Sequence, residues 1–371
     1  MPDNLDQINV TTRQYIRTKP GLTDNVFNQD PLNFFLRQNL REDFTGGSFI
    51  AENFIYAPMI GGAYTKGKQF NVSMKQTMQS LWFDMRFTQV SVPLYQEDIR
   101  VLNKGPLAAI KLLKAKVDEA YMALGAFVSI AAYLPGTGAG WQFGPNGLAE
   151  ALNDGATASW NGVLYPLYGG LTRATFAPAL NSVPLPVVGA IEYDTIDQAY
   201  MSVFYGSGQY EPNLMVTTPL GFSYLKSKYQ TQQRFNDVTL KVGVGFRGME
   251  INGATIVASR YCPGSYITGP AGAGTADPVA VQYLSESSQG SGNPIAAYPV
   301  GSLGVAGESL FILNARKPFL NYYVDSDALF GGGFRDFIPA GNNTILVGQV
   351  LLAHNLTVNP RYHRHIYGFT S

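Results

Sequence analysis

A strand pattern that runs directly into a long helical pattern, over residues 80–134, constrains the fold of this chain most strongly. In its first part apolar and polar residues alternate, and this two-residue period is typical of a strand with one buried face. The predicted strand places Phe83, Met85 and Phe87 on its apolar side and Asp84, Arg86 and Thr88 on its polar side. The sequence therefore predicts one long, half-buried strand.

The second part is a predicted helix over residues 106–134. Pro106 suits a first helical position, and the Pro135-Gly136 pair is a stop signal. At ~1.5 Å per residue, about 29 residues form a rod of roughly 44 Å, which favours a structural part over a catalytic pocket. Apolar side chains recur every three or four positions, so we expect these residues in the helix core: Ile110, Leu113, Val117, Tyr121, Leu124 and Val128.

The low charge of the chain favours contact with other chains, although monomeric proteins can have the same composition. Charged residues make up 14% of the sequence, against roughly 25% in ordinary soluble proteins, and aromatic residues make up 13%. Such a composition suits a chain that buries much of its surface against partners. The formal net charge of zero disfavours a dedicated nucleic-acid binder, whose affinity rests on neutralising phosphates, but leaves contact through one local face open.

The single cysteine indicates that the chain is made in a reducing compartment. Its hydropathy pattern predicts no segment that spans a membrane. Cys262 is the only cysteine, so an intrachain disulfide and a multi-cysteine zinc site are both excluded. Residues 1–20 are polar and carry no signal-peptide core. The most apolar run, residues 121–134, is about 14 residues long and too short to span a bilayer. We expect a soluble chain made in the cytoplasm.

The N-terminal quarter predicts an extended arm, one short helix and a two-stranded ribbon. Asp30-Pro31 supplies an N-cap and a first-turn proline for the helix. Residues 41–93 then show strand patterns with glycine turns, and a ribbon of two strands is only marginally stable alone. Either another part of the chain or another subunit must cover it. Lys66, Lys68 and Lys75 are interpreted either as charges that protect a solvated strand edge or as contacts with a neighbouring subunit.

The remaining chain predicts a mixed α/β region from Gly189 onward. Its signals are a capping box at residues 195–198, a strand at 213–217, a helix opened by Thr218-Pro219 and a hairpin about Asn252-Gly253. Residues 262–304 predict a long loop, and the three glycines at 331–333 predict a break. Closing strands are expected at 344–353 and 364–369, and Asn161-Gly162 predicts a small hairpin.

No catalytic, metal or cofactor site is predicted, so we expect a protein that is not an enzyme. Residues 243–248 have the glycine spacing of a dinucleotide-binding fingerprint, but a predicted hairpin strand follows them instead of the required helix. His363 and His365 lie on one predicted strand face, where we expect a polar surface because their spacing supplies no third or fourth ligand. Cys262 precedes Pro263-Gly264 in a predicted loop and is interpreted as an unreactive thiol.

Several segments, taken in order, resemble the major capsid protein of tailed double-stranded DNA bacteriophages, which has the Hong Kong 97-like capsid fold. The segments that carry the resemblance are residues 147–155 followed by 168–173, residues 213–219, residues 233–235 with the hairpin at 245–258, and residues 351–361. Together with the arm, ribbon and long helix, they extend the resemblance over nearly the whole chain.

The resemblance implies an α+β fold with five parts. These are an N-terminal arm (1–40), an extended β-hairpin loop called the E-loop (41–100), a peripheral domain with a spine helix and a small β insertion (101–188), an axial domain (189–339) and closing strands of the peripheral domain (340–371).

The resemblance also implies self-assembly as hexamers and pentamers into an icosahedral shell around double-stranded DNA. Implied partners are portal and scaffolding or decoration proteins, with the packaged DNA contacted non-specifically, and the expected locations are the virion and, during assembly, the host bacterial cytoplasm. Expected contacts between subunits are Phe83, Met85, Phe87, Lys66, Lys68 and Lys75. The alternatives are an encapsulin-like compartment shell, a nucleotide-using enzyme and, least favoured, a secreted β-rich binding module.

Overall fold

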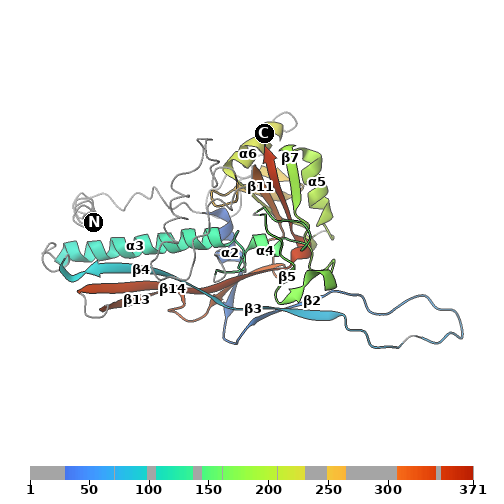
Figure 1. Cartoon of the computed structure of the whole chain (residues 1–371), viewed down its shortest axis with the longest axis horizontal. Coiled ribbons are helices and arrows are strands. Elements are labelled where there is room, and N and C mark those ends of the chain that lie inside the picture. Colours follow the sequence, from blue (N-terminus) through green and yellow to red (C-terminus); the bar gives the residue numbers. More distant parts are fainter. Residues whose placement is uncertain are drawn as a thin grey trace.

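The computed structural model describes residues 30–70, 72–97, 106–136, 144–160, 162–206, 208–229, 249–264, 307–339 and 344–370, with only the backbone for 106–114 and 229. The fold is α+β, as the sequence predicts: two large sheets, two small two-stranded sheets and a few helices. Figure 1 shows a long horizontal layer, an upright sheet beside it and a thin ribbon that projects from their junction.

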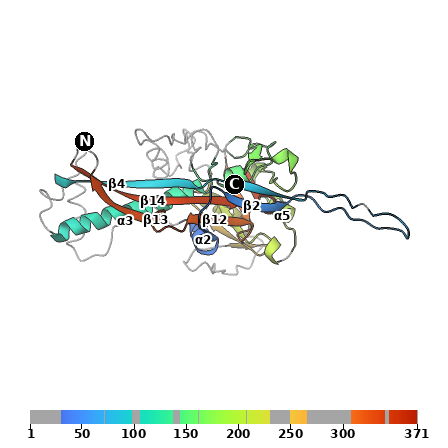
Figure 2. The same cartoon turned by 90° about the horizontal axis from the view of Figure 1, so that it is seen from below.

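The long layer consists of helix α3 (Pro106–Ala131) lying along a sheet centred on β14 (Ile345–Val358). On one side β14 pairs antiparallel with β4 (Arg86–Tyr95), from Ile345↔Tyr95 to His354↔Arg86. On its other side lie β13 (Gly331–Pro339) and β12 (Leu320–Asp325), and β1 (Arg41–Phe44) pairs parallel with β12. Figure 2, seen from below, shows β4, β14 and β13 running side by side along α3.

The upright sheet has six strands in the order β7-β15-β11-β8-β10-β9. Their bounds are β7 Leu185–Ala190, β15 Arg364–Thr370, β11 Glu308–Leu313, β8 Leu214–Thr217, β10 Ala254–Ala258 and β9 Met249–Ile251. Helices α5 (Tyr193–Ser202) and α6 (Pro219–Tyr229) pack on it. The Asn252-Gly253 hairpin is confirmed, because β9 and β10 pair antiparallel on either side of it. The helix opened by Thr218-Pro219 is also confirmed, since the Thr218 hydroxyl accepts a hydrogen bond from Gly221 N.

The projecting ribbon is formed by β2 (Ile50–Ile55) and β3 (Met78–Phe83), which pair antiparallel. Before it lies α2 (Pro31–Asn39), whose predicted N-cap is confirmed because the Asp30 carboxylate accepts a hydrogen bond from Asn33 N at 3.0 Å. The shorter elements are α4 (Leu148–Ala151), β5 (Leu167–Tyr168), β6 (Leu171–Thr172) and 3₁₀ turns at Arg173–Thr175, Gly208–Tyr210 and Pro360–Tyr362.

The prediction of one continuous strand before the long helix is wrong. β3 ends at Phe83 and β4 begins at Arg86, and the two strands pair with different partners, β2 and β14. The buried face changes phase at this break: Phe83 is 3% exposed, whereas Phe87 is 66% exposed and Thr88 is buried. Local alternation could not reveal the change because it depends on which strand lies opposite each half.

The long helix α3 is confirmed, and its core assignment needs one correction. Leu124 and Val128 are buried and Val117 is half-buried, but Tyr121 is 41% exposed and is not a core residue. Tyrosine tolerates such a position at the edge of a buried stripe because its ring has an apolar body and a polar tip. Ile110 and Leu113 lie in the part of α3 whose side chains are outside the described set. No helix among the described residues has the length and hydropathy of a membrane span.

Other local signals also gave wrong predictions. Helix α5 begins at Tyr193 after Glu192, with no side-chain cap, so the capping box at 195–198 lies inside the helix. The glycines at 331–333 begin β13 instead of breaking the chain. Glycine is needed there because a Cβ on Gly333 would lie 2.1 Å from the Ala328 carbonyl oxygen. The predicted Asn161-Gly162 hairpin is not tested, because Asn161 lies outside the described residues; beside it, Gly162 N donates a hydrogen bond to the Ser159 carbonyl and Ser159 N donates to the Val163 carbonyl.

Candidate assembly surface

The root of the ribbon, where β2 and β3 leave the body, is covered by the chain itself. Ile50, Leu81 and Phe83 are each 3% exposed. The Phe83 ring contacts the Tyr168 ring edge-on, with centroids 5.2 Å apart, and Phe176 packs against Phe54 on β2. Of the two covers that the sequence leaves open, another part of the chain, around residues 165–176, is the one found at the root of the ribbon.

A glycine turn brings that covering segment against β3. Gly169 has φ +53°, and a Cβ there would lie 2.7 Å from Leu81 Cδ2. The Gly169 carbonyl accepts a hydrogen bond from Trp82 N at 3.0 Å. The backbone of the covering segment is therefore hydrogen-bonded directly to the backbone of β3. The Gly169-Gly170 pair was the available sequence signal, because such pairs permit close backbone approach.

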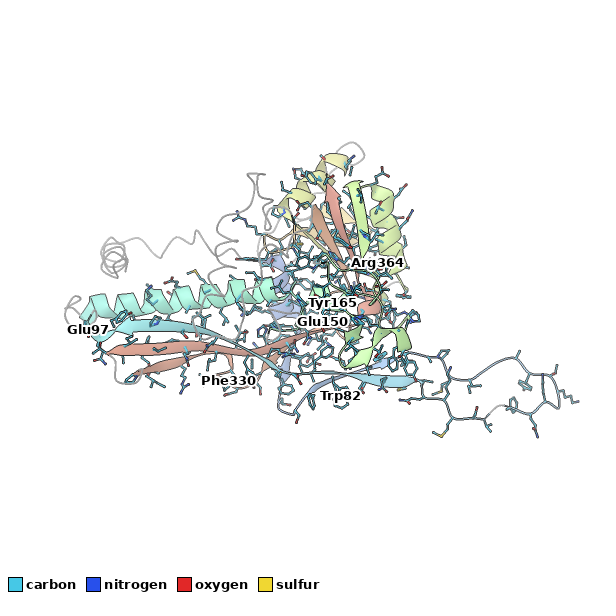
Figure 3. All side chains as sticks on the ribbon, viewed as in Figure 1. Trp82, Glu97, Glu150, Tyr165, Phe330 and Arg364 are labelled. Carbon is cyan, nitrogen blue, oxygen red and sulfur yellow. The ribbon has the colours of Figure 1, made fainter. Side chains whose placement is uncertain are left out.

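A buried arginine, Arg173, holds the covering segment in shape. Its guanidinium donates hydrogen bonds to the carbonyl oxygens of Tyr165, Leu180, Glu150 and Ala151 and lies over the Tyr168 ring, 4.8 Å from its centroid. Burial lowers the pKa of Arg173 to about 10, so the group stays charged at neutral pH. Figure 3 shows Glu150 and Tyr165 together at the junction of the long layer and the upright sheet.

The Glu52 carboxylate ties β2 to the long layer. Its Oε1 atom accepts three hydrogen bonds of 2.9 Å each, from Asn321 Nδ2, the Tyr323 hydroxyl and the Thr357 hydroxyl. Asn321 and Tyr323 belong to β12, and Thr357 belongs to β14. Hydrogen bonds to an ionised acceptor are stronger than neutral ones, so this contact fixes the start of the ribbon to the body.

Beyond its root, the ribbon presents an apolar surface to solvent. Between Tyr56 and Thr77 the exposed large apolar side chains are Met59, Ile60, Tyr64, Phe70, Val72 and Met74, and Met74 is fully exposed. The one ring contact among them joins Tyr64 and Phe70, with centroids 4.9 Å apart. Lys66, Lys68 and Lys75 are exposed beside them. An apolar surface of this extent on a thin projection indicates a contact site for another molecule.

The outer face of the long layer is also partly apolar. Phe87 and Tyr95 on β4 and Ile338 on β13 are exposed, and the Phe87 ring meets the Phe330 ring with centroids 6.2 Å apart. Met85, at the break between β3 and β4, is half-buried and packs against the core. Of the expected subunit contacts, Phe87 and the three lysines are therefore available, whereas Phe83 is enclosed within its own chain.

The described residues contain no group of three or more histidine, cysteine or acidic side chains that could hold a metal ion. The expected polar face at His363 and His365 is wrong, since both imidazoles are fully buried. Asn314 N donates to His363 Nδ1, so Nε2 of His363 donates to the Phe319 carbonyl, and the His365 ring stacks on Phe311 with centroids 4.1 Å apart. Cys262 is buried, and burial raises the pKa of its thiol, which disfavours the thiolate form. The fingerprint at 243–248 lies outside the described residues.

No protein-family model and no curated protein matches the chain in sequence. Among solved structures, it is similar to the capsid protein of cyanophage A-1(L), with a TM-score of 0.61 at 14% identity, over 98% of this chain and 99% of that chain. A capsid chain of a native GTA particle gives a TM-score of 0.53 at 10% identity over 96% of both chains. The capsid of Myoviridae phage XM1 gives 0.52 at 10% identity over 96% of this chain and 97% of that one. The chain thus has the Hong Kong 97-like fold of tailed-phage capsid proteins.

Proposed function

We propose that this protein is the structural subunit of an icosahedral capsid, assembling as hexamers and pentamers around a double-stranded DNA genome. The observation that carries the proposal is the ribbon: its root is fixed by Glu52, Tyr168 and Gly169, while its outer part exposes apolar side chains that its own chain leaves uncovered. A fold shared over nearly the full length with capsid chains supports the same role.

We retain the division of the chain that the resemblance implies. Residues 41–100 would form an E-loop, 101–188 and 340–371 a peripheral domain built on α3, and 189–339 an axial domain, with residues 1–40 as an arm. Four strands cross these bounds: β4, β12 and β13 pair within the long layer, and β15 pairs within the upright sheet. In this assignment Phe87, Met85, Lys66, Lys68 and Lys75 contact a neighbouring subunit. Phe83 leaves that set because it packs inside its own subunit.

The remaining partners follow from the role as a shell. Portal and scaffolding or decoration proteins would join the assembly, and packaged DNA would be contacted without sequence preference. The net charge of zero suits a wall that encloses DNA but does not bind it tightly. The virion is the proposed location, after assembly in the cytoplasm of a host bacterium.

Electron microscopy of the expressed protein tests the proposal. Negative staining of the chain, alone or with a scaffolding protein, should show closed particles of uniform size. Val72→Asp and Met74→Asp should prevent particle formation without unfolding the subunit, because each puts a charge on the exposed apolar surface of the ribbon. Val72→Ile is the matched control and should assemble as the wild type does.

Three results would contradict this function. A subunit that stays monomeric at high concentration, with its ribbon ordered, would argue against any shell. Particles that carry protein cargo and no DNA in the native host would identify an encapsulin-like compartment. Saturable nucleotide binding that Gly245→Val abolishes would favour the enzyme alternative.

A further inference from the structure

The bend between β3 and β4 lies where the ribbon leaves the long layer. β3 belongs to the ribbon and pairs with β2, whereas β4 belongs to the long layer and pairs with β14. Only Asp84 and Met85 separate the two strands. A small rotation of the backbone at these residues would swing the whole outer part of the ribbon, which makes no contact with the long layer in Figures 1 and 2.

Asn355 on β14 contacts this bend, and every polar group of its side chain is hydrogen-bonded. Its Nδ2 donates hydrogen bonds to the Asp84 carbonyl at 2.7 Å and to Asn146 Oδ1 at 3.0 Å. Its Oδ1 accepts hydrogen bonds from Asn146 N at 2.9 Å and from Leu356 N at 2.8 Å. An asparagine amide offers two donors and two acceptor lone pairs, so the side chain is fully used and has one orientation that satisfies it.

The contact continues from Asn355 to the end of the long helix. Asn146 Nδ2 donates to Glu150 Oε2 at 3.1 Å, and the same oxygen accepts a hydrogen bond from Gly136 N at 3.0 Å, five residues after α3 ends. Asn146, Glu150 and Asn355 are all nearly or fully buried. A buried network with satisfied members is rigid, because each group loses its partner if another moves.

We propose that Asn355 is a positioning residue that sets the direction in which the ribbon leaves the body. Its hydrogen bonds through Asn146 and Glu150 connect the bend at Asp84 to the segment that follows α3. These contacts keep the angle between the ribbon and the helix constant. If the proposed capsid function holds, this angle also decides which part of a second copy the ribbon reaches, and therefore the curvature of the shell.

Spin-label distance measurement on the unassembled subunit tests the proposal without requiring a shell. Labels at Ile55→Cys, on the exposed end of β2, and Glu119→Cys, on the exposed side of α3, report the angle between ribbon and helix. The native Cys262 is buried and does not compete for the label. Asn355→Ala should broaden and shift the distance distribution, and should make amide exchange in β3 about tenfold faster.

Asn314→Ala is the matched control. Asn314 is equally buried and its Nδ2 likewise donates to one loop carbonyl, that of Gln209 at 2.7 Å, but it lies at the end of β11, outside the bend. Its loss should lower stability and leave the label distances unchanged. Asn146→Ala, which removes the link to α3 but keeps Asn355, should broaden the distribution less than Asn355→Ala.

Distances in Asn355→Ala that match the wild type would overturn the proposal, and so would equal broadening in Asn314→Ala. If Asn355→Ala does not fold, the distance distribution of Asn146→Ala provides the test: broadening supports the proposal, and a distribution that matches the wild type overturns it. Particle diameter in the assembled state is a separate readout. Altered distances with no particles from the wild type would support the positioning role and reject the capsid function.

Discussion

Truncating Phe83 and Phe87 to alanine should separate folding from assembly, because the two rings lie four residues apart in environments of opposite kind. Phe83 is 3% exposed and its ring contacts Tyr168. Burying a phenylalanine side chain contributes roughly 1.5–3 kcal/mol, and an aromatic pair adds about 0.5–1.5 kcal/mol. With the cavity that remains, Phe83→Ala should lower the free energy of unfolding by about 3–5 kcal/mol.

Phe87→Ala should have a much smaller effect on the isolated subunit. The side chain is 66% exposed, so about a third of the transfer free energy is at stake, roughly 0.5–1 kcal/mol. If the outer face of β4 meets a neighbouring subunit, the same truncation removes an aromatic anchor from that interface. Assembly should then weaken more than folding does, because interface aromatics carry a large share of binding energy.

Urea unfolding of the dissociated subunit, followed by fluorescence, measures the first quantity for both variants. Particle yield, from sedimentation of assembly reactions at matched folded-subunit concentration, measures the second. Phe87→Asp extends the series by placing a charge where Phe87→Ala only removes a contact. It should leave the subunit folded and reduce particle yield further.

Equal destabilisation of the subunit by the two alanine variants would refute the change of buried face at Asp84 and Met85. It would mean that one continuous strand face is buried, as the alternation in the sequence alone suggests. Normal particle yield from Phe87→Asp would instead leave the fold intact and remove the outer face of β4 from the assembly surface.

Three further predictions concern pH, a glycine and a carboxylate. Burial lowers the pKa of three histidines, to about 3 for His354 and His365 and about 4 for His363. Their unfolded forms bind protons first, so stability should fall as pH drops below about 6.5. Asp30 acts in the opposite direction, since burial raises its pKa to about 6, but three groups outweigh one, and melting temperature against pH should decline toward acid. Gly169→Ala should destabilise by about 1–3 kcal/mol, because its Cβ would meet Leu81; Gly170→Ala, with φ +79° but open space around it, isolates the backbone contribution in the same melting assay. Glu52→Ala should loosen the ribbon root, seen as faster amide exchange in β2, whereas Glu52→Gln keeps an acceptor and should change it less.

Several elements were determined by local chemistry alone. Asp30 and Pro31 specify the start of α2, because a carboxylate can satisfy an early helix amide and proline suits the first turn. Asn252 and Gly253 specify the β9–β10 turn, since both adopt positive φ, 51° and 79°. Pro106 and the apolar spacing after it specify α3. Each signal acts between residues a few positions apart, so the sequence carries it in readable form.

The buried histidines show where a local interpretation fails. His363 and His365 alternate with Arg364 on a terminal strand, a pattern that suits a polar surface. β15, which begins directly after His363, lies inside a sheet, between β7 and β11. Residues from distant parts of the chain therefore contact both imidazoles: the Phe311 ring stacks on His365, and the Phe319 carbonyl accepts a hydrogen bond from His363 Nε2. Nothing near residue 363 in the sequence reports that enclosure.

By itself the sequence determined the order of short helix, ribbon, long helix and mixed α/β region, and the α+β class that follows from it. Only the tertiary structure decided which side of the segment before α3 is buried and what covers the ribbon root. The bend at Asp84 is held by Asn355, 271 positions later in the chain, and the root is covered by Tyr168 and Gly169. Alternation records that one face of a strand is apolar, but its burial depends on partners that only folding brings alongside.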